Sequence, residues 1–115
     1  MIGANVDVSI IEIVQDAGFD SSEKWSVVES TRGRFEALSG DEQVTAQRLE
    51  RRSTHRLYVD RTVADSDKRV VVNGGDYAGV YLVRFVDRPS GGSLTDARID
   101  LEYIGTVQDA GIELV

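Results

Sequence analysis

The sequence predicts a mainly β protein: a small antiparallel β-barrel or sandwich of about six strands, with one short helix inserted between strands. β-branched and aromatic residues fill several short stretches, apolar and polar residues alternate within most of them, and turn-forming residues separate them. The chain has 115 residues, the usual size of one domain. We therefore expect residues 1–115 to form a single domain.

The N-terminal third is expected to hold two long strands. Residues 6–14 are β-branched almost throughout, which predicts a strand that is apolar on more than one face. Turn-forming residues follow at 16–22. From Trp25 to Ala37 the odd positions are mainly apolar, which is typical of a long half-buried strand, and Gly33 is a candidate for a bend in it.

The one expected helix covers residues 42–52, which are mostly good helix formers. Ser39 or Asp41 is positioned to cap its first turn. Few of its side chains are apolar, so this helix would bury little against the strands. A weakly anchored helix on a rigid β framework is a candidate for movement or for contact with a partner.

Strand patterns return in the second half. Residues 54–63 alternate, and residues 69–72 and 77–86 flank Asn73-Gly74-Gly75-Asp76, a hairpin signal because such turns need positive φ. Residues 77–86 are apolar on both faces, so this strand is expected to lie centrally or to cover an interface.

The C-terminal part is expected to contain one more strand and a tail. Residues 98–104 alternate clearly, with Ile99, Leu101 and Tyr103 expected to face inward. Residues 106–115 end in an apolar sequence and are a candidate docking tail.

Composition excludes several classes of function. The net charge of −7 argues against tight binding to a nucleic-acid backbone. The absence of cysteine excludes disulfides, thiolate zinc sites and cysteine nucleophiles, and a single histidine excludes His-rich metal sites. No apolar run reaches the roughly 20 residues of a membrane helix, and residues 1–7 lack a secretory signal pattern. We expect no membrane contact, no cofactor, no metal and no enzymatic activity, with synthesis in a cytoplasm.

Positive charge is concentrated in one segment. Arg48, Arg51, Arg52 and Arg56 outweigh Glu50 and give this stretch a charge of +3, which leaves −10 for the rest. On a helix, the first three of these arginines would crowd one side and repel one another. The segment is either a solvated face or a surface whose counter-charge comes from an acidic neighbouring subunit or, transiently, from DNA.

Two other groups contain residue types that occur in catalytic or metal sites. His55 has Asp60 nearby in sequence, but on a strand the two side chains point to opposite faces, so a packed or interfacial histidine is favoured over a catalytic triad. Asp65 and Asp67 flank Ser66 without the spacing of a calcium loop, which favours a solvated tip.

The order of several short motifs resembles that of the tailed-phage head–tail joining proteins, also called head–tail adaptors or stoppers. The resemblance covers roughly residues 20–104. Its motifs are Ala37-Leu38-Ser39-Gly40-Asp41-Glu42, Thr54-His55-Arg56-Leu57, Lys68-Arg69-Val70-Val71, Gly74-Gly75-Asp76-Tyr77 and Arg98-Ile99-Asp100-Leu101. The sequence departs from the pattern in a first strand without basic residues and in a longer connection at 79–93, which also allows a domesticated particle such as a gene transfer agent.

The resemblance implies a virion neck component that forms a ring beneath the portal, closes the DNA channel after packaging and offers a surface to the tail. Its implied partners are copies of itself, the portal or adaptor above, the tail terminator or a tail protein below, and transiently DNA, after synthesis in the bacterial host cytoplasm. The segment from Ser39 to Arg56 is the expected contact and gating region, with Gly40 as a hinge, and the tip at 65–68 competes for the inward position. The site candidates are Ser39, Gly40, Asp41, Glu42, Arg48, Arg51, Arg52, His55, Arg56, Asp65, Asp67 and Lys68.

Three alternatives to the stopper ring remain. An adaptor or tail-terminator ring would differ in its neighbours and not in its chemistry. A small β-barrel module that binds a protein or a sugar is the second class of function, and a hydrolase with two carboxylates is a distant third.

Overall fold

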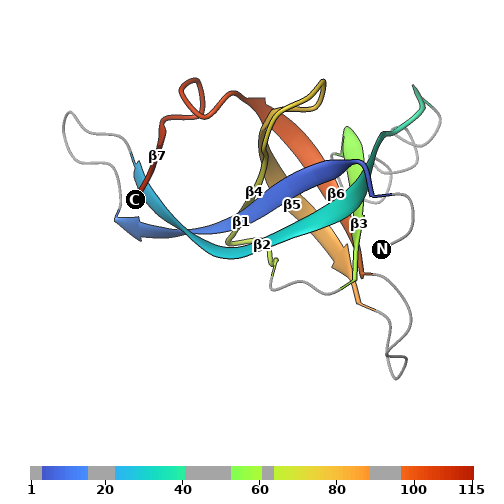
Figure 1. The fold of residues 1–115 in the computed structure, drawn as a ribbon, viewed down its shortest axis with the longest axis horizontal. Helices are drawn as coiled ribbons and strands as arrows, with labels where there is room; N and C mark the ends of the chain where they lie inside the picture. Colours follow the sequence, from blue (N-terminus) through green and yellow to red (C-terminus); the bar gives the residue numbers. More distant parts are fainter. Residues whose placement is uncertain (1–3, 16–22, 41–52, 61–63, 89–96) are drawn as a thin grey trace.

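The computed structural model describes residues 4–15, 23–40, 53–60, 64–88 and 97–115, and this part of the chain is mainly β (Figure 1). As the alternation predicts, six strands form a closed antiparallel barrel, to which one extra strand is added. The strands are β1 (Val6–Gln15), β2 (Glu23–Ala37), β3 (His55–Val59), β4 (Arg69–Val72), β5 (Gly79–Asp87), β6 (Ala97–Gly105) and β7 (Ile112–Leu114). The helix expected at 42–52 lies outside the described residues.

The barrel closes because β1 pairs with strands on both of its sides. The order β1-β4-β5-β6-β3-β2 runs around the wall, and pairing of β1 with β2 joins its two ends. Closure satisfies the backbone hydrogen-bonding groups that an open sheet would leave at its edges. β7 stands outside this ring and joins the start of β2 in parallel.

The barrel is filled by side chains that alternate inward along each strand. In β1, for example, Val6, Val8 and Ile10 all point into the same buried cluster. We call this cluster the barrel core. Its buried members are Val6, Val8, Ile10, Phe35, Leu57, Val59, Ala64, Val70, Val72, Tyr81, Val83, Ala97, Ile99 and Leu101.

Gly33 has a different role from the expected bend. The register irregularity of β2 lies opposite Ile10 and Ile11, where the paired residues jump from Glu29 to Val27. A Cβ atom on Gly33 would lie only 2.7 Å from Leu57 Cδ1 and from the Tyr58 carbonyl oxygen. Glycine is therefore required here because β3 passes too close to the β2 backbone for a side chain.

The turn between β4 and β5 needs positive φ, as predicted, but it is longer than expected. Gly74 and Gly75 have φ values of 94° and 79°. β4 ends at Val72 and β5 begins at Gly79, so Tyr77 and Ala78 belong to the turn and not to the strand. β5 itself lies between β4 and β6 within the wall, in agreement with its apolar character on both faces.

Tyr103 shares the face predicted for it but is less buried than the other two inward residues. Ile99 and Leu101 are fully buried in β6, whereas Tyr103 on the same face is 44% exposed. Tyr103 lies near the end of the strand, where its ring packs edge-on against Tyr81 at 5.3 Å and covers the backbone of Gly79. Alternation sets the face of a residue, but its depth depends on how close it lies to the rim.

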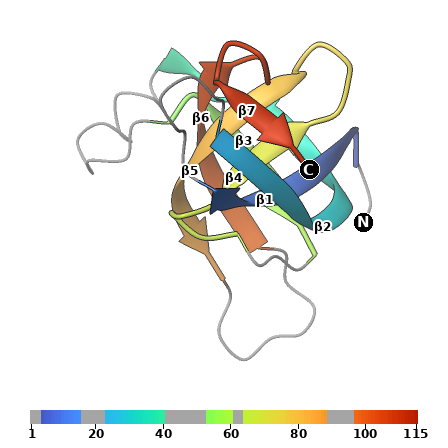
Figure 2. The same cartoon turned by 90° about the vertical axis from the view of Figure 1, so that its left-hand side faces the viewer.

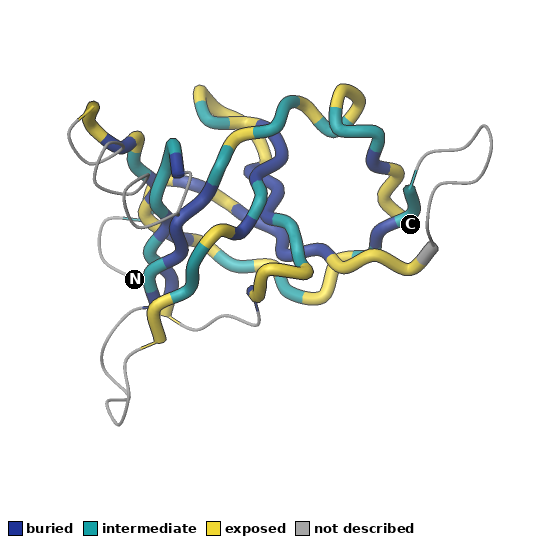
Figure 3. Tube along the Cα trace, turned by 180° about the vertical axis from the view of Figure 1, so that it is seen from behind, coloured by how far each residue is buried: buried dark blue, intermediate teal, exposed yellow. Residues whose placement is uncertain are grey.

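Beyond its pairing with β4 and β3, the β1–β2 hairpin projects from the barrel (Figures 1 and 2). We call residues 12–15 of β1, residues 23–29 of β2, β7 and Val115 together the arm. A second buried cluster lies where the arm leaves the barrel and contains Ile11, Trp25, Val71, Val80 and Ile112. Figure 3 shows buried residues concentrated in the barrel and exposed stretches toward the end that carries the C-terminus. Within the described residues, no helix has the length and apolar character that a membrane crossing requires.

Candidate functional site

The expected contact and gating segment starts and ends at one place on the barrel. Leu38 is buried at the end of β2, and its N–H donates to the carbonyl of Thr54 at 2.9 Å, just before β3. Ser39 and Gly40 follow Leu38 and are exposed. The other candidates of this segment lie outside the described residues: Asp41, Glu42, Arg48, Arg51 and Arg52.

His55, at the start of β3, belongs to an aromatic cluster. Its ring lies 5.3 Å from Phe35, 5.6 Å from Tyr77 and 5.2 Å from Tyr81, measured between centroids. The Thr54 hydroxyl lies 2.8 Å from Nδ1. Burial lowers the pKa of His55 from 6.5, because the charged imidazolium loses hydration there. His55 is thus a neutral, half-buried packing residue at neutral pH.

Tyr81 is the most buried ring of this cluster. Its hydroxyl donates a 2.7 Å hydrogen bond to the Tyr77 carbonyl, which ties β5 to the turn before it. Burial, with smaller effects from Tyr103 and Tyr77, raises the pKa of Tyr81 to about 12. The phenol therefore stays protonated and acts as a hydrogen-bond donor at physiological pH.

Arg56 forms an internal ion pair that the sequence pattern did not reveal. Its Nε donates to Asp100 Oδ1 at 2.9 Å, and the Asp100 side chain is only 3% exposed. Arg98 Nε lies 3.9 Å from the same oxygen. Burial by itself would lower the pKa of Arg56, but the hydrogen bond and charge of Asp100 outweigh it and raise the pKa. Arg56 thus has a structural partner within its own barrel.

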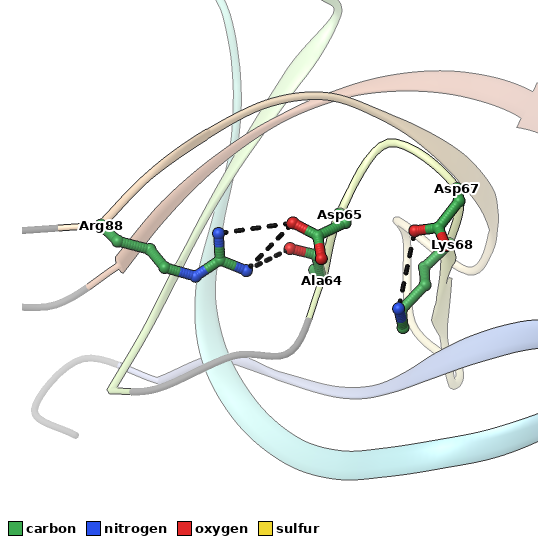
Figure 4. Close-up of polar contacts among 5 residues, drawn as sticks. All are labelled: Ala64, Asp65, Asp67, Lys68 and Arg88. Carbon is green, nitrogen blue, oxygen red and sulfur yellow. Dashed lines mark hydrogen bonds and ion pairs between the residues drawn. The ribbon is translucent and has the colours of Figure 1, made fainter.

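The polar tip between β3 and β4 is held against the end of β5 (Figure 4). Arg88 donates to the Ala64 carbonyl and lies 3.4 Å from Asp65 Oδ1. The Lys68 N–H donates to the Asp65 carbonyl at 2.9 Å, and Lys68 Nζ lies 3.5 Å from Asp67 Oδ1. Of the three candidates at this tip, Asp67 has the most exposed side chain, at 77%.

A pocket of about 260 Å³ separates this tip from β5. Arg84 lines it and pairs with Glu102 on β6, and Arg88 lines it and pairs with Asp65. Val83, Phe85 and Val86 supply its apolar wall. Because both arginines already have carboxylate partners, the pocket offers little uncompensated charge to a ligand. Groups of three or more His, Cys, Asp or Glu that could hold a metal do not occur among the described residues.

The arm is the main exposed apolar surface of the described residues. Of its members, only those in the candidate docking tail at 106–115 were predicted from the sequence to make contacts. Exposure is highest at Val14 (53%) and Val115 (66%). The full set of large apolar side chains exposed on the arm is Ile13, Val14, Val27, Val28, Leu114 and Val115. Several large apolar side chains exposed on one projecting element are a feature of interaction sites. The sequence feature that indicates this surface is the first strand, which is apolar on more than one face although only one face points into the barrel.

The arm also has an incomplete strand edge. β7 pairs with β2 at Glu23–Trp25 and β3 pairs with it at Arg34–Ala37. Between them, residues 26–33 pair with β1 on one side, and within the described ranges no strand pairs with the other side. A strand edge of this kind accepts an additional strand from another chain.

No known family model matches the chain, and no curated protein matches it. The fold is similar to the solution structure of protein SF1141 from Shigella flexneri 2a, with a TM-score of 0.66 and 17% sequence identity. The similarity covers 89% of this chain and 95% of that one. At this identity the likeness shows the fold alone.

Proposed function

We propose that this chain is a structural subunit of a tailed-phage-type neck, in which copies stand side by side in a ring between the portal or adaptor and the tail. The proposal starts from the motif order that resembles the head–tail joining proteins across roughly residues 20–104. In this role the chain makes and breaks no covalent bond. Its work is to bind copies of itself, to bind the rings above and below, and to close the channel that holds the packaged DNA.

The observation that carries the proposal is the separation of a closed barrel from an apolar arm. A molecule that binds copies of itself around a ring needs two different surfaces, one for the neighbour on each side. The arm projects at one end of the 43 Å long axis and is distinct from the barrel wall (Figure 1). Its exposed Val14 and Val28 would be covered in such a ring, and a monomer would leave them in water.

The gating role is assigned to the segment from Ser39 to Arg56, and the Leu38–Thr54 hydrogen bond joins the residue before this segment to its C-terminal part. A segment rooted at one point of each subunit fills a narrow bore when several copies converge on its axis. The net charge of −7 suits a channel wall, because an acidic wall repels DNA and does not retain it.

The proposal is tested on the neck of tailed particles purified from cells that carry this chain. We expect a reconstruction of the particle to contain the chain as a ring between portal and tail. A triple replacement of Arg48, Arg51 and Arg52 by Glu is expected to leave the barrel folded but to abolish ring stacking or DNA retention. Glycine replacement at Asp65 and Asp67 is the control for the competing tip.

Three outcomes would reject the proposal. One is absence of the chain from the neck, and another is turnover of a substrate by the purified protein. The third is a monomer that binds one partner protein with one-to-one stoichiometry, which would favour the small β-barrel binding module.

A further inference from the structure

β7 is the most weakly attached strand of the described fold. It pairs in parallel with β2 through three residue pairs, Glu23 with Ile112, Lys24 with Glu113 and Trp25 with Leu114. Every other strand is part of the closed antiparallel barrel. A three-residue strand with one neighbour contributes few hydrogen bonds to stability, so it opens more easily than the barrel.

The docking site of β7 on β2 is nevertheless well defined. Ile112 is 6% exposed and packs in the second buried cluster with Trp25 and Ile11. The Val115 N–H donates to the Trp25 carbonyl at 2.9 Å, and the Glu23 N–H donates to the Gly111 carbonyl at 3.1 Å. The arm therefore carries a preformed site for one short apolar strand, and that strand is the tail of this same chain.

The segment before β7 forms a compact turn held mainly by local hydrogen bonds, and Val107 and Ala110 pack it against the second buried cluster. The Ala110 N–H donates to the Thr106 carbonyl at 2.9 Å, and the Gly111 N–H donates to the Gln108 carbonyl at 3.1 Å. Gly105 and Gly111, at φ 128° and 70°, flank this turn and adopt such angles at little cost. If the turn opens, the seven Cα–Cα steps from Gly105 to Ile112 span about 23 Å in extended form, which lets β7 leave its own β2.

When β7 pairs with β2 of its own chain, apolar side chains beside it stay exposed and the next part of the β2 edge stays unpaired by any described strand. Leu114 remains 43% exposed and Val115 66% exposed, next to the exposed Val27. β7 runs parallel to β2, so its C-terminal end points along the open edge of residues 26–33. The apolar site on β2 thus continues past the end of the strand that fills it.

We infer that β7 is exchanged between copies: in the assembled protein the tail of one chain docks on β2 of the next. The occupant is a second copy of this chain, because the site on β2 already fits residues 112–115 and the same contacts re-form in the neighbour. Exchange of an identical element costs little, since only the connecting turn changes. Approach of the neighbour then covers Val27, Leu114 and Val115. The inference deepens the self-association part of the proposed function and rests on it.

The test uses the absence of native cysteine. Two single variants of the full chain, Lys24→Cys and Glu113→Cys, are mixed under assembly conditions and treated with a short thiol cross-linker. These residues are register partners in β2 and β7, so they react between chains only when one chain's tail sits on the other's arm. The double variant at high dilution confirms that the pair reacts within a single chain.

A matched control uses Arg34→Cys mixed with Tyr58→Cys. These residues are register partners across β2 and β3 inside the barrel wall, where exchange is not expected. We expect the Lys24/Glu113 mixture to give several-fold more cross-linked dimer than the Arg34/Tyr58 mixture, in the oligomeric fraction. Equal yields overturn the exchange, as does a chain that stays monomeric. Oligomers without the specific cross-link reject the exchange and leave the neck proposal standing.

Discussion

The barrel and the arm differ in how completely their strands are paired and their apolar side chains are buried. Strand pairing closes the barrel all round, and residues such as Ile10 and Leu57 inside it are fully buried. The arm has one strand edge without a neighbour among the described strands and several exposed apolar side chains. The barrel is therefore a self-sufficient scaffold, and the arm is where interaction with another chain would complete the structure.

The largest expected difference in stability is between two Leu→Ala variants, one in the barrel and one in the arm. Leu57→Ala should destabilise the protein by about 4 kcal/mol, because it removes a fully buried side chain and leaves a cavity. Leu114→Ala on the arm, where the side chain is 43% exposed, should change the free energy of unfolding by less than about 0.5 kcal/mol. Urea unfolding followed by circular dichroism measures both. Similar losses in the two variants would mean that the arm is as well packed as the barrel.

The next prediction concerns the ion pair of the barrel wall. Asp100→Ala should cost about 3 kcal/mol, because it leaves Arg56 without its carboxylate partner in a largely buried position. Glu102→Ala removes the carboxylate partner of Arg84, which is more exposed than Asp100, and should cost less than about 1 kcal/mol. Thermal unfolding of the two variants at one pH gives the comparison. An Asp100→Ala protein as stable as Glu102→Ala would show that the buried pair adds no net stability.

The third prediction compares the stability of alanine variants at two glycines. Gly33→Ala should cost about 2 kcal/mol, since the new methyl group would lie within 2.8 Å of atoms of Leu57, Tyr58 and Val59. For Gly40→Ala, no atom of the described residues lies within 4 Å of the added Cβ, so this variant should be nearly neutral. Denaturant midpoints of the two variants decide the matter. An unchanged midpoint for Gly33→Ala would mean that β3 moves away from β2 at little cost.

The smallest effect is expected from pH. The fold lowers the His55 pKa from 6.5 by burial, so the unfolded chain takes up the proton first as pH falls. The His55 contribution to stability is therefore complete above pH 6.5, decreases below it, and is lost once the folded form protonates as well. Unfolding curves between pH 5 and pH 8 should show a smaller decrease for His55→Gln than for the original chain. Parallel curves for the two proteins would exclude His55 as the group responsible.

Much of the barrel could be predicted from the sequence because its signals are local. β-branched alternation places β1 and β2 within about a residue or two of their observed ends, and Asn73-Gly74-Gly75 locates the turn before β5. Such patterns reflect the two-residue period of a strand and the φ angles of a turn, and both are properties of short segments. The exact length of that turn was missed because local patterns do not show where cross-strand pairing begins.

The candidate site was harder to predict, because its features depend on contacts between distant residues. Arg56 was expected to face a partner, yet its carboxylate comes from Asp100, far along the chain. Asp100 alternates with Ile99 and Leu101, so the pattern assigns it to an outer, polar face, and only the neighbouring strand buries it. The projection of the arm beyond the barrel was not predicted, because an apolar strand does not show where its pairing with neighbouring strands ends.

An acidic protein built of β-strands follows directly from composition and from the two-residue alternation within each segment. Three features follow only from contacts between distant segments: β1 and β2 extend beyond the barrel, β7 pairs in parallel with part of β2, and Gly33 lies against β3. Those outcomes depend on the register and length of strands far apart in the chain, and barrel closure sets both at once.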